Sequence, residues 1–327
     1  MSSDACKTIE RRGGRGVARA DARPSVTRTA FRVARHRPTM ASDASDRSDT
    51  FDIGGELTVN RLGFGAMRVT GESIIGRPDD EAAAKRVLER AVDLGVDFVD
   101  TADSYGPGVS ERLVGEALSD PDDVVVASKA GLLRNRDGDW LPHGDPDFLR
   151  NQVLCSLDRL GTETIDLYQY HRPDPDTDFA ESVHAFAEMK DAGQIAHVGL
   201  SNVSVEQLET AADIVDVATV QNRYDVGNRD EEDVLRACED RDVGFIPWGP
   251  LYAVDEEGPA AVLGEVAARR DATPQQVALA WLLDHSDVTL PIPGTSSVDH
   301  LESNVAAATL ELTDEDVSAL DAIDPQP

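Results

Sequence analysis

From residue 51 to the end of the chain, short apolar runs alternate with longer stretches in which apolar residues recur at helical spacing. This alternation is typical of βαβ units, in which helices join parallel strands. The predicted strands are residues 61–67, 96–99, 124–128, 165–170, 195–200, 218–220, 244–246 and 288–291. The predicted helices are residues 79–94, 147–160, 178–192, 231–241, 259–270, 274–283 and 313–323, with further helices beginning near residues 110, 204 and 298.

The number of units favours a closed barrel. Eight strands, each followed by a helix, predict a (β/α)8 TIM barrel of the α/β class, with extra C-terminal helices. Two short extended pieces around Gly54-Gly55 predict a β-hairpin at residues 51–59, ahead of the first strand. The alternative is a doubly wound sheet with a dinucleotide-binding glycine fingerprint, but Gly63, Gly65 and Gly71 lack its spacing. We therefore expect a single barrel domain over residues 51–327.

The N-terminal segment differs in composition from the rest of the chain. Residues 1–39 contain ten Lys or Arg and three acidic residues, and they show no hydrophobic periodicity. Because such a segment cannot bury a core, we expect residues 1–50 to be a disordered leader. Arg11-Arg12 resembles the start of a twin-arginine signal, but no apolar region follows it. A transit peptide or a nucleic-acid-binding arm is an alternative; we favour translation from Met40, with residues 1–39 untranslated or disordered.

The remainder of the chain is strongly acidic. The whole sequence has 62 Asp or Glu against 31 Lys or Arg, and after Met40 the lysines are Lys85, Lys129 and Lys190. An acid-rich, lysine-poor surface favours a halophilic protein, because high salt screens the self-repulsion of such a charge. A generic acidic cytosolic protein is the alternative. In either case the barrel should repel the phosphates of nucleic acids, so no nucleic-acid partner is expected.

Three further observations narrow the class of protein. No run of about 18 apolar residues occurs, so we expect no membrane-spanning helix. Cys6, Cys155 and Cys238 lie far apart and form neither a disulfide framework nor a zinc-binding spacing, which favours a reducing cytoplasm. Clustered His, Asp and Glu ligands are also missing, so metal chemistry is not expected.

Polar residues stand where the predicted strands end. Asp100 ends the second strand, with Tyr105 five residues later, and this pair alone is equally well explained as a turn cap and a packed ring. The third to sixth strands end at Lys129, His171, Ser201-Asn202 and Gln221. Each has a structural explanation on its own, such as a loop lysine, a core histidine or a helix cap. Since barrel enzymes carry their active sites at the carboxyl ends of the strands, the whole set indicates an acid–base network around Tyr105.

Seven ordered motifs give the chain a specific resemblance. They are DTADSY (100–105), SKAG (128–131), DLYQYHRPD (166–174), GLSN (199–202), VQNRY (220–224), PWGPL (247–251) and PIPGTSS (291–297). From about residue 51 to residue 327 the chain resembles the aldo-keto reductases, most strongly their bacterial-type monomeric members of broad substrate range. The resemblance implies an NAD(P)H-dependent oxidoreductase that reduces aldehydes or ketones to alcohols, acting as a monomer on a small carbonyl substrate.

The resemblance also implies a catalytic set of four residues: Asp100, Tyr105, Lys129 and His171. Carbonyl reduction needs an acid for the developing alkoxide, and the reference pKa of tyrosine is near 10. The Lys129 ammonium is expected to stabilise the phenolate and lower that pKa, while Asp100 keeps Lys129 charged. His171 is expected to orient the substrate oxygen or to help relay the proton.

The barrel has no hydride of its own, so a nicotinamide cofactor is implied. By the resemblance, its carboxamide is held by Ser201, Asn202 and Gln221. Trp248 is expected to stack on the nicotinamide, although a core tryptophan is an alternative. The resemblance assigns the pyrophosphate to Gly249 and Leu251. It assigns an anionic phosphate to Gly294, Thr295, Ser296 and Ser297, which lead into a helix N-terminus. It places His300 and Asn304 near the adenine.

One departure from the resemblance affects the choice of cofactor. Many family members place Lys or Arg near Gly294, Ser297 or His300 to hold the 2′-phosphate of NADP, whereas this chain has hydroxyl groups and a histidine there. We predict NADP, because hydroxyls and a helix N-terminus still bind phosphate, and keep NAD or dual use as alternatives. An alcohol or sugar dehydrogenase and a nucleotide-binding regulatory subunit are the alternative functions. The loop at residues 130–146, with Trp140 and His143, is expected to select the substrate.

Overall fold

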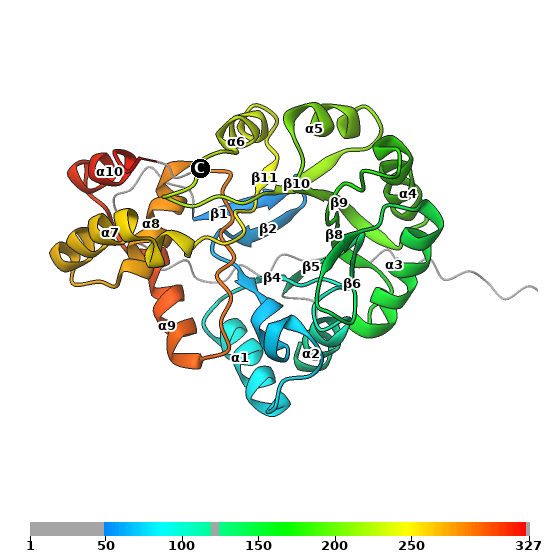
Figure 1. Ribbon diagram of the computed structural model, residues 1–327, viewed down its shortest axis with the longest axis horizontal. Helices are drawn as coiled ribbons and strands as arrows, with labels where there is room; N and C mark the ends of the chain where they lie inside the picture. The colour runs from blue at the N-terminus through cyan, green and yellow to red at the C-terminus, as the bar shows by residue number, and fades with distance from the viewer. Residues whose placement is uncertain (1–48, 119–123, 325–327) are drawn as a thin grey trace, which may run out of the picture. The chain divides into compact units, whose positions relative to one another are not determined.

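The computed structural model describes residues 49–118 and 124–324 (Figure 1). The predicted disordered leader and the predicted start at Met40 concern residues that lie outside the described ranges. In the described part, a seven-stranded parallel sheet has the order β11-β10-β9-β8-β5-β4-β3. Its strands are β3 (Phe64–Gly65), β4 (Phe98–Asp100), β5 (Val125–Ala130), β8 (Ile165–Tyr170), β9 (Ile195–Ser201), β10 (Val217–Gln221) and β11 (Gly244–Phe245).

An extended segment at residues 288–293 closes this sheet into a barrel. On one side the Phe245 N–H donates to the Val288 carbonyl at 2.8 Å, and on the other the Gly63 N–H donates to the Pro291 carbonyl at 3.0 Å. The segment therefore takes the place of the predicted eighth strand between β11 and β3. Its ladder is short because Pro291 and Pro293 have no N–H to donate. The predicted (β/α)8 barrel is confirmed.

Helices surround the strands, as Figure 1 shows. They are α1 (Glu81–Asp93), α2 (Val109–Ala117), α3 (Pro146–Leu160), α4 (Phe179–Asp191), α5 (Val205–Ala212), α6 (Glu232–Glu239), α7 (Glu257–Arg270), α8 (Pro274–His285), α9 (Val298–Ala306) and α10 (Asp314–Asp321). Their starts follow capping rules. Asp80 accepts from the Ala83 N–H, so α1 begins two residues after its predicted start, and Thr273 forms a capping box ahead of Pro274.

A hairpin closes the amino-terminal end of the barrel. β1 (Thr50–Ile53) pairs with antiparallel β2 (Leu57–Asn60) around a turn in which Gly54 and Gly55 have φ angles of 60° and 72°. Ile53 and Val59 are buried against the apolar side chains that the barrel strands direct inward. The predicted hairpin is thus present, and it fills one end of the barrel.

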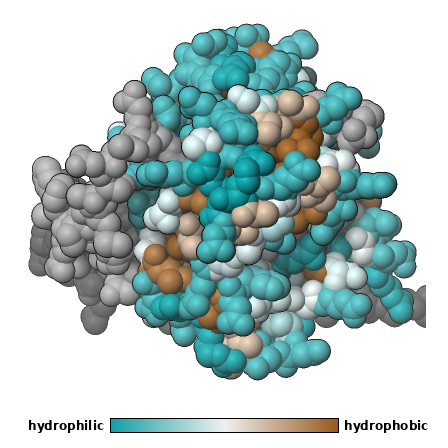
Figure 2. Space-filling model, turned by 90° about the vertical axis from the view of Figure 1, so that its left-hand side faces the viewer, coloured by the Kyte–Doolittle hydropathy of each residue, from teal (hydrophilic) through white to brown (hydrophobic). Residues whose placement is uncertain are grey.

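The C-terminal helix α10 packs beside α7 (Figure 1). The buried Asp316 of α10 accepts from Arg269 at 2.8 Å and also pairs with Arg270, both in the last turn of α7. Around these helices the visible surface is largely hydrophilic, with scattered apolar groups (Figure 2). No helix in the described part of the chain combines the length and apolar character that crossing a bilayer requires.

The loop expected at residues 130–146 has more structure than predicted. β6 (Leu132–Arg134) and β7 (Trp140–Pro142) form a small antiparallel hairpin within it. Three residue pairs fix its register, with Arg134 opposite Trp140. Short strands of this kind escape prediction because their stability comes from contacts with the rest of the barrel rather than from their own pattern.

Candidate active site

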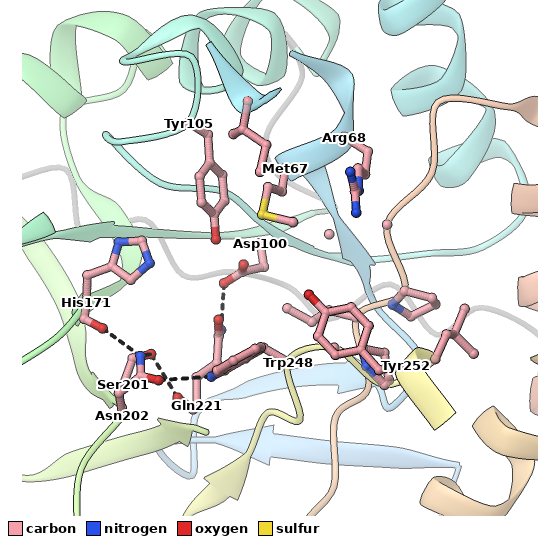
Figure 3. Close-up of a pocket in the computed structure, with 18 of the residues that line it drawn as sticks. Met67, Arg68, Asp100, Tyr105, His171, Ser201, Asn202, Gln221, Trp248 and Tyr252 are labelled. Atoms are coloured by element: carbon pink, nitrogen blue, oxygen red, sulfur yellow. Dashed lines mark hydrogen bonds between the residues drawn. The ribbon is translucent and has the colours of Figure 1, made fainter. Parts of the chain in front are cut away.

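A cavity of about 470 Å³ opens at the carboxyl ends of the barrel strands. Figure 3 shows Asp100, Tyr105 and His171 on one side of it and Arg68 and Tyr252 on the other. Of the residues expected at the site, those that line the cavity are Asp100, Tyr105, His171, Ser201, Asn202, Gln221, Trp248, Gly249, Leu251 and Gly294. The hairpin of β1 and β2 fills the opposite end of the barrel.

Lys129 lies behind the cavity wall, fully buried between an acid and a phenol. Parallel pairing of β4 with β5 places it beside Asp100. Its Nζ donates to Asp100 Oδ1 at 2.5 Å, to the Thr101 carbonyl at 2.9 Å and to Tyr105 Oη at 3.4 Å. Burial by itself would lower the pKa of Lys129, but Asp100 and Tyr105 outweigh burial and raise that pKa above its usual value. Lys129 is therefore a permanent cation next to the tyrosine hydroxyl.

The second carboxylate oxygen of Asp100 also has partners. The side-chain amides of Gln169 and Gln221 each donate to Asp100 Oδ2 at 3.0 Å. Sequence reasoning missed Gln169, although strand alternation places it on the same inward face as His171, two residues later. Gln221 was expected to hold the nicotinamide carboxamide; here it lines the cavity while its amide nitrogen donates to Asp100.

Tyr105 is 7% exposed and sits in a tight loop between β4 and α2. The next residue, Gly106, has a φ of 75°, and a Cβ there would lie 2.9 Å from the Gly76 carbonyl oxygen, so only glycine fits. Burial raises the pKa of Tyr105 above 10.0, and the Lys129 ammonium opposes this effect without cancelling it. The expected net lowering of this pKa is therefore wrong: Lys129 limits a rise that burial causes.

His171 follows β8 and is nearly buried. Its ring meets Tyr105 edge-on, with centroids 5.9 Å apart, and its Nδ1 lies 3.3 Å from Ser104 Oγ. Burial, with the positive charges of Lys129 and Arg172, holds the pKa of His171 well below its usual value. The imidazole is therefore neutral at neutral pH, and it can position an oxygen atom beside Tyr105 without adding charge.

Ser201, Asn202 and Trp248 are joined by hydrogen bonds next to this cluster. Ser201 Oγ donates to the Gln221 carbonyl at 2.8 Å, Asn202 Nδ2 donates to the His171 carbonyl at 3.0 Å, and Trp248 Nε1 donates to Asn202 Oδ1 at 3.1 Å. Asn202 has a φ of 58°, a strained conformation typical of functional sites. These bonds hold Trp248 at the cavity wall, where an aromatic face and amide groups suit a planar amide-bearing ring.

Five residues expected to hold the far end of the cofactor do not line the cavity: Thr295, Ser296, Ser297, His300 and Asn304. The structure uses two of them locally. Ser297 Oγ accepts from the His300 N–H at 3.4 Å as the cap of α9, and Thr295 Oγ1 accepts from the Ser297 N–H at 3.1 Å. The cavity instead receives Arg68, an exposed side chain near Gly294 that sequence reasoning missed. Its guanidinium suits a phosphate of the cofactor.

The hairpin of β6 and β7 is clamped to the site by Arg134. The guanidinium lies 3.6 Å from the centroid of the Trp140 ring and donates to the carbonyls of Ser73 at 3.0 Å and Ile74 at 3.2 Å. Ser73 and Ile74 have positive φ angles of 56° and 61°. A positive φ is strained for Ile74 in particular, because its side chain is β-branched. Ile74 lines the cavity, and Trp140 meets Tyr105 edge-on at 6.3 Å. Arg134 therefore fixes two walls of the cavity.

Replacing Arg134 with Gln should loosen both walls. For the aldehyde reduction that the sequence resemblance implies, we expect the KM for a bulky aromatic aldehyde to rise about 10-fold, which is ~1.4 kcal/mol and within the range of a cation–π contact with its hydrogen bonds. The kcat should stay within about threefold, because Tyr105 and Lys129 are untouched. Steady-state kinetics against Arg136→Gln, an exposed arginine of the same hairpin, provide the control. An equal fall of kcat with every aldehyde and no change in KM would contradict this role.

A closed parallel barrel with buried charged and aromatic side chains at the carboxyl ends of its strands defines an enzyme scaffold. The Aldo/keto reductase family model matches residues 61–254 and 255–325. The chain belongs to the aldo-keto reductase family and is an oxidoreductase. The sequence resemblance is thereby confirmed.

Individual relatives agree with this assignment. An uncharacterized oxidoreductase of Schizosaccharomyces pombe is 45% identical over 284 residues, covering 86% of this chain and 93% of that protein. The pyridoxine 4-dehydrogenase of Escherichia coli is 39% identical, covering 84% and 98%. A glycerol dehydrogenase structure from Gluconobacter oxydans has a TM-score of 0.76 at 28% identity, covering 84% of this chain and 94% of that one.

A structure of the Klebsiella pneumoniae aldo-keto reductase in complex with NADP and acetate has a TM-score of 0.74 at 26% identity, covering 86% of this chain and 96% of that chain. The family uses NAD(P)H, so the prediction of a nicotinamide cofactor is confirmed. The cavity of this chain fits such a group through Trp248, the amides of Asn202 and Gln221, and the cation of Arg68.

Proposed function

We propose that this protein reduces aldehydes or ketones to alcohols with NADPH, and that Tyr105 is the proton donor. The observation that carries the proposal is the contact of a buried, charged Lys129 with both Asp100 and the Tyr105 hydroxyl at the wall of the cavity. Burying a cation costs several kcal/mol, so the stability of the fold alone does not explain why Lys129 is buried here. It is suited to stabilise negative charge that develops on Tyr105.

The residues of the chain divide the work of reduction. The bound NADPH supplies the hydride. Tyr105 gives its proton to the carbonyl oxygen as that oxygen becomes an alkoxide, which is a far stronger base than a phenolate. Lys129 stabilises the phenolate that remains, and Asp100 keeps Lys129 charged and aimed. The neutral His171 holds the carbonyl oxygen near Tyr105 Oη, so that the proton moves over a short distance.

For the cofactor, Ser201, Asn202 and Gln221 hold the carboxamide, and Trp248 covers one face of the nicotinamide. Gly249 and Leu251 would contact the pyrophosphate. Gly294, Thr295, Ser296 and Ser297, which lead into α9, would bind an anionic phosphate at the helix N-terminus. His300 and Asn304 would lie near the adenine. The NADP complex of the Klebsiella pneumoniae relative supports NADP as the cofactor. The first turn of α9 contains the acidic Asp299 and no Lys or Arg, and Arg68 near Gly294 supplies a cation for the phosphate instead.

The test is cofactor oxidation at the nicotinamide absorbance, with NADPH and NADH in turn and a panel of aliphatic and aromatic aldehydes. We expect turnover with several aldehydes and a lower KM for NADPH than for NADH. Failure to oxidise either cofactor with any aldehyde, in dilute and in concentrated salt, would refute the reductase. A lower KM for NADH would refute the cofactor choice alone.

The same site also supports oxidation of an alcohol, which is the second candidate. Two relatives are named for that direction, a pyridoxine 4-dehydrogenase and a glycerol dehydrogenase. By microscopic reversibility the Tyr105 phenolate then accepts the proton that it donates in reduction. Oxidation should need a high pH, since burial makes the phenolate harder to form.

The pH dependence of reduction follows from the directions of two pKa shifts. Tyr105 must be protonated, and because its pKa is raised above 10.0, activity should fall only above pH 10. His171 should give no transition between pH 6 and 7, because its pKa lies well below 6.5 and it stays neutral there. A plot of log kcat/KM against pH, measured from pH 5.5 to 11, tests both expectations. A falling limb near pH 7 would show that another group is the acid.

Three expectations from the sequence are carried forward as proposals: the protein is a monomer, it works in the cytoplasm, and it is halophilic. The excess of 62 acidic over 31 basic residues supports the last of these. Activity and ellipticity should persist above about 1 M salt, where the Debye length is about 3 Å, and should decline in dilute buffer. Equal activity and stability at both extremes would contradict it.

A further inference from the structure

Arg172 is an arginine without a partner at the active-site cavity. It directly follows His171 at the end of β8 and lines the cavity, and its Nε is buried without a hydrogen-bond acceptor. No salt bridge or hydrogen bond joins it to another side chain among residues 49–118 and 124–324. A buried donor without an acceptor costs about 1–3 kcal/mol, so its retention calls for a ligand.

The lack of an acid next to Arg172 contrasts with several other arginines of the described chain. Arg90 pairs with Glu302 at 2.7 Å, and Arg150 pairs with Glu188 at 2.8 Å. The chain has twice as many acidic as basic residues, so a partner is easily supplied. Of the acids that line the cavity, Asp100 is already bound to Lys129, and Asp255 follows β11 in another part of the rim.

The strand order separates Arg172 from the phosphate side of the cofactor. Trp248, Gly249 and Gly294 follow β11 and the closing segment, and Arg68 follows β3, so these groups are adjacent around the barrel. Arg172 follows β8, three strands from β3. β8 is next to β5, which carries Lys129, and β5 is in turn next to β4, which carries Asp100. Figure 3 shows Arg68 across the cavity from His171. Arg172 thus belongs to the side where the carbonyl is protonated.

We propose that Arg172 binds an anionic group of the substrate, so that the preferred substrate is an aldehyde or ketone bearing a carboxylate or phosphate. This inference rests on the proposed reductase function and names its substrate class. The planar guanidinium binds either group through paired N–H donors, and the bound anion satisfies the buried Nε. The anion also offsets the positive charge that Arg172 places near His171.

The experiment compares anionic aldehydes with neutral partners of the same shape. The carboxylate arm uses 2-, 3- and 4-carboxybenzaldehyde, each against its methyl ester, and the phosphate arm uses glyceraldehyde 3-phosphate against glyceraldehyde. For at least one pair we expect kcat/KM to favour the anion by about 10-fold or more in the wild type. Arg172→Gln should lower kcat/KM for that anion about 10- to 100-fold, mainly through KM, and change its neutral partner less than about threefold. Which arm responds tells carboxylate from phosphate.

Three further variants test the charge, the position and the geometry of Arg172. Arg86→Gln removes an equal charge from an arginine whose side chain is 60% exposed on α1, and it should leave every ratio unchanged. Arg68→Gln should raise the KM for NADPH without changing the preference for anions. Arg172→Lys should recover part of the preference, since a cation remains but the paired donors are lost.

The outcomes separate this inference from the proposed function. Reduction of neutral aldehydes with no anion preference, or equal losses for anion and ester in Arg172→Gln, would overturn the role of Arg172 and leave the reductase intact. If no aldehyde is reduced, the product pair 4-(hydroxymethyl)benzoate and its methyl ester is titrated by tryptophan fluorescence. Binding of the acid that is no tighter than binding of the ester, or that is unaffected by Arg172→Gln, would overturn the inference without any turnover.

Discussion

Replacing Tyr105 with Phe should lower kcat about 10²- to 10⁴-fold, the usual contribution of a positioned general acid. The substitution removes only the hydroxyl that lies 3.4 Å from Lys129 Nζ. The ring contacts with His171 and Trp140 stay, so binding of the cofactor and of the aldehyde should change little. Stability should also change by no more than about 1 kcal/mol, because one long hydrogen bond is lost.

Tyr252→Phe is the matched control, since Tyr252 lines the same cavity on its other side (Figure 3). It should retain kcat within about threefold. The two variants are compared by steady-state kinetics and by cofactor titration. If Tyr105→Phe retained near wild-type kcat, or if Tyr252→Phe lost as much as Tyr105→Phe, Tyr105 could not be the proton donor.

Replacing Lys129 with Met should damage both activity and stability. The change leaves Asp100, 1% exposed, without its cation, and breaking a buried pair in this way typically costs about 3–5 kcal/mol. Loss of the charge beside Tyr105 should lower kcat by about 10²- to 10³-fold. Urea unfolding followed by circular dichroism measures the first effect, and steady-state kinetics measure the second.

A double variant distinguishes an uncompensated charge from simple loss of packing, because Asp100→Asn removes the charge that Lys129→Met leaves unpaired. Asp100→Asn combined with Lys129→Met should recover part of the stability but none of the activity. A double variant no more stable than Lys129→Met, or a single variant as stable as wild type, would contradict the pairing.

Local sequence patterns were sufficient for the architecture and for the position of the four central residues. Asp100, Lys129 and His171 could be predicted because a parallel barrel brings every carboxyl strand end to one rim. Gln169 could have been found from strand alternation, since it faces the same way as His171. The apolar run at residues 288–291 located the segment that closes the barrel, although Pro291 and Pro293 limit its hydrogen bonding, so that it is an extended segment and not a strand.

What could not be predicted depends on contacts between distant segments. The net rise in the pKa of Tyr105 comes from burial, which no sequence spacing reveals. The hydrogen bond of Arg134 to the Ile74 carbonyl joins residues 60 positions apart in the chain. The missing partner of Arg172 is visible only once every nearby side chain has been placed. At the start of α9, the sequence could not tell that Ser297 caps the helix instead of lining the cavity.

The most direct test of the central claim follows the hydrogen atoms in the reaction. NADPH deuterated at C4 of the nicotinamide, on one face at a time, is incubated with wild type and Tyr105→Phe and an aldehyde that the wild type reduces. In the wild type, only one of the two labelled forms of NADPH should pass its deuterium to the carbinol carbon of the alcohol. Tyr105→Phe should still bind NADPH, but it should transfer deuterium less than about one hundredth as fast. Oxidation of NADPH without deuterium in the alcohol, or equally fast transfer by Tyr105→Phe, would contradict the account.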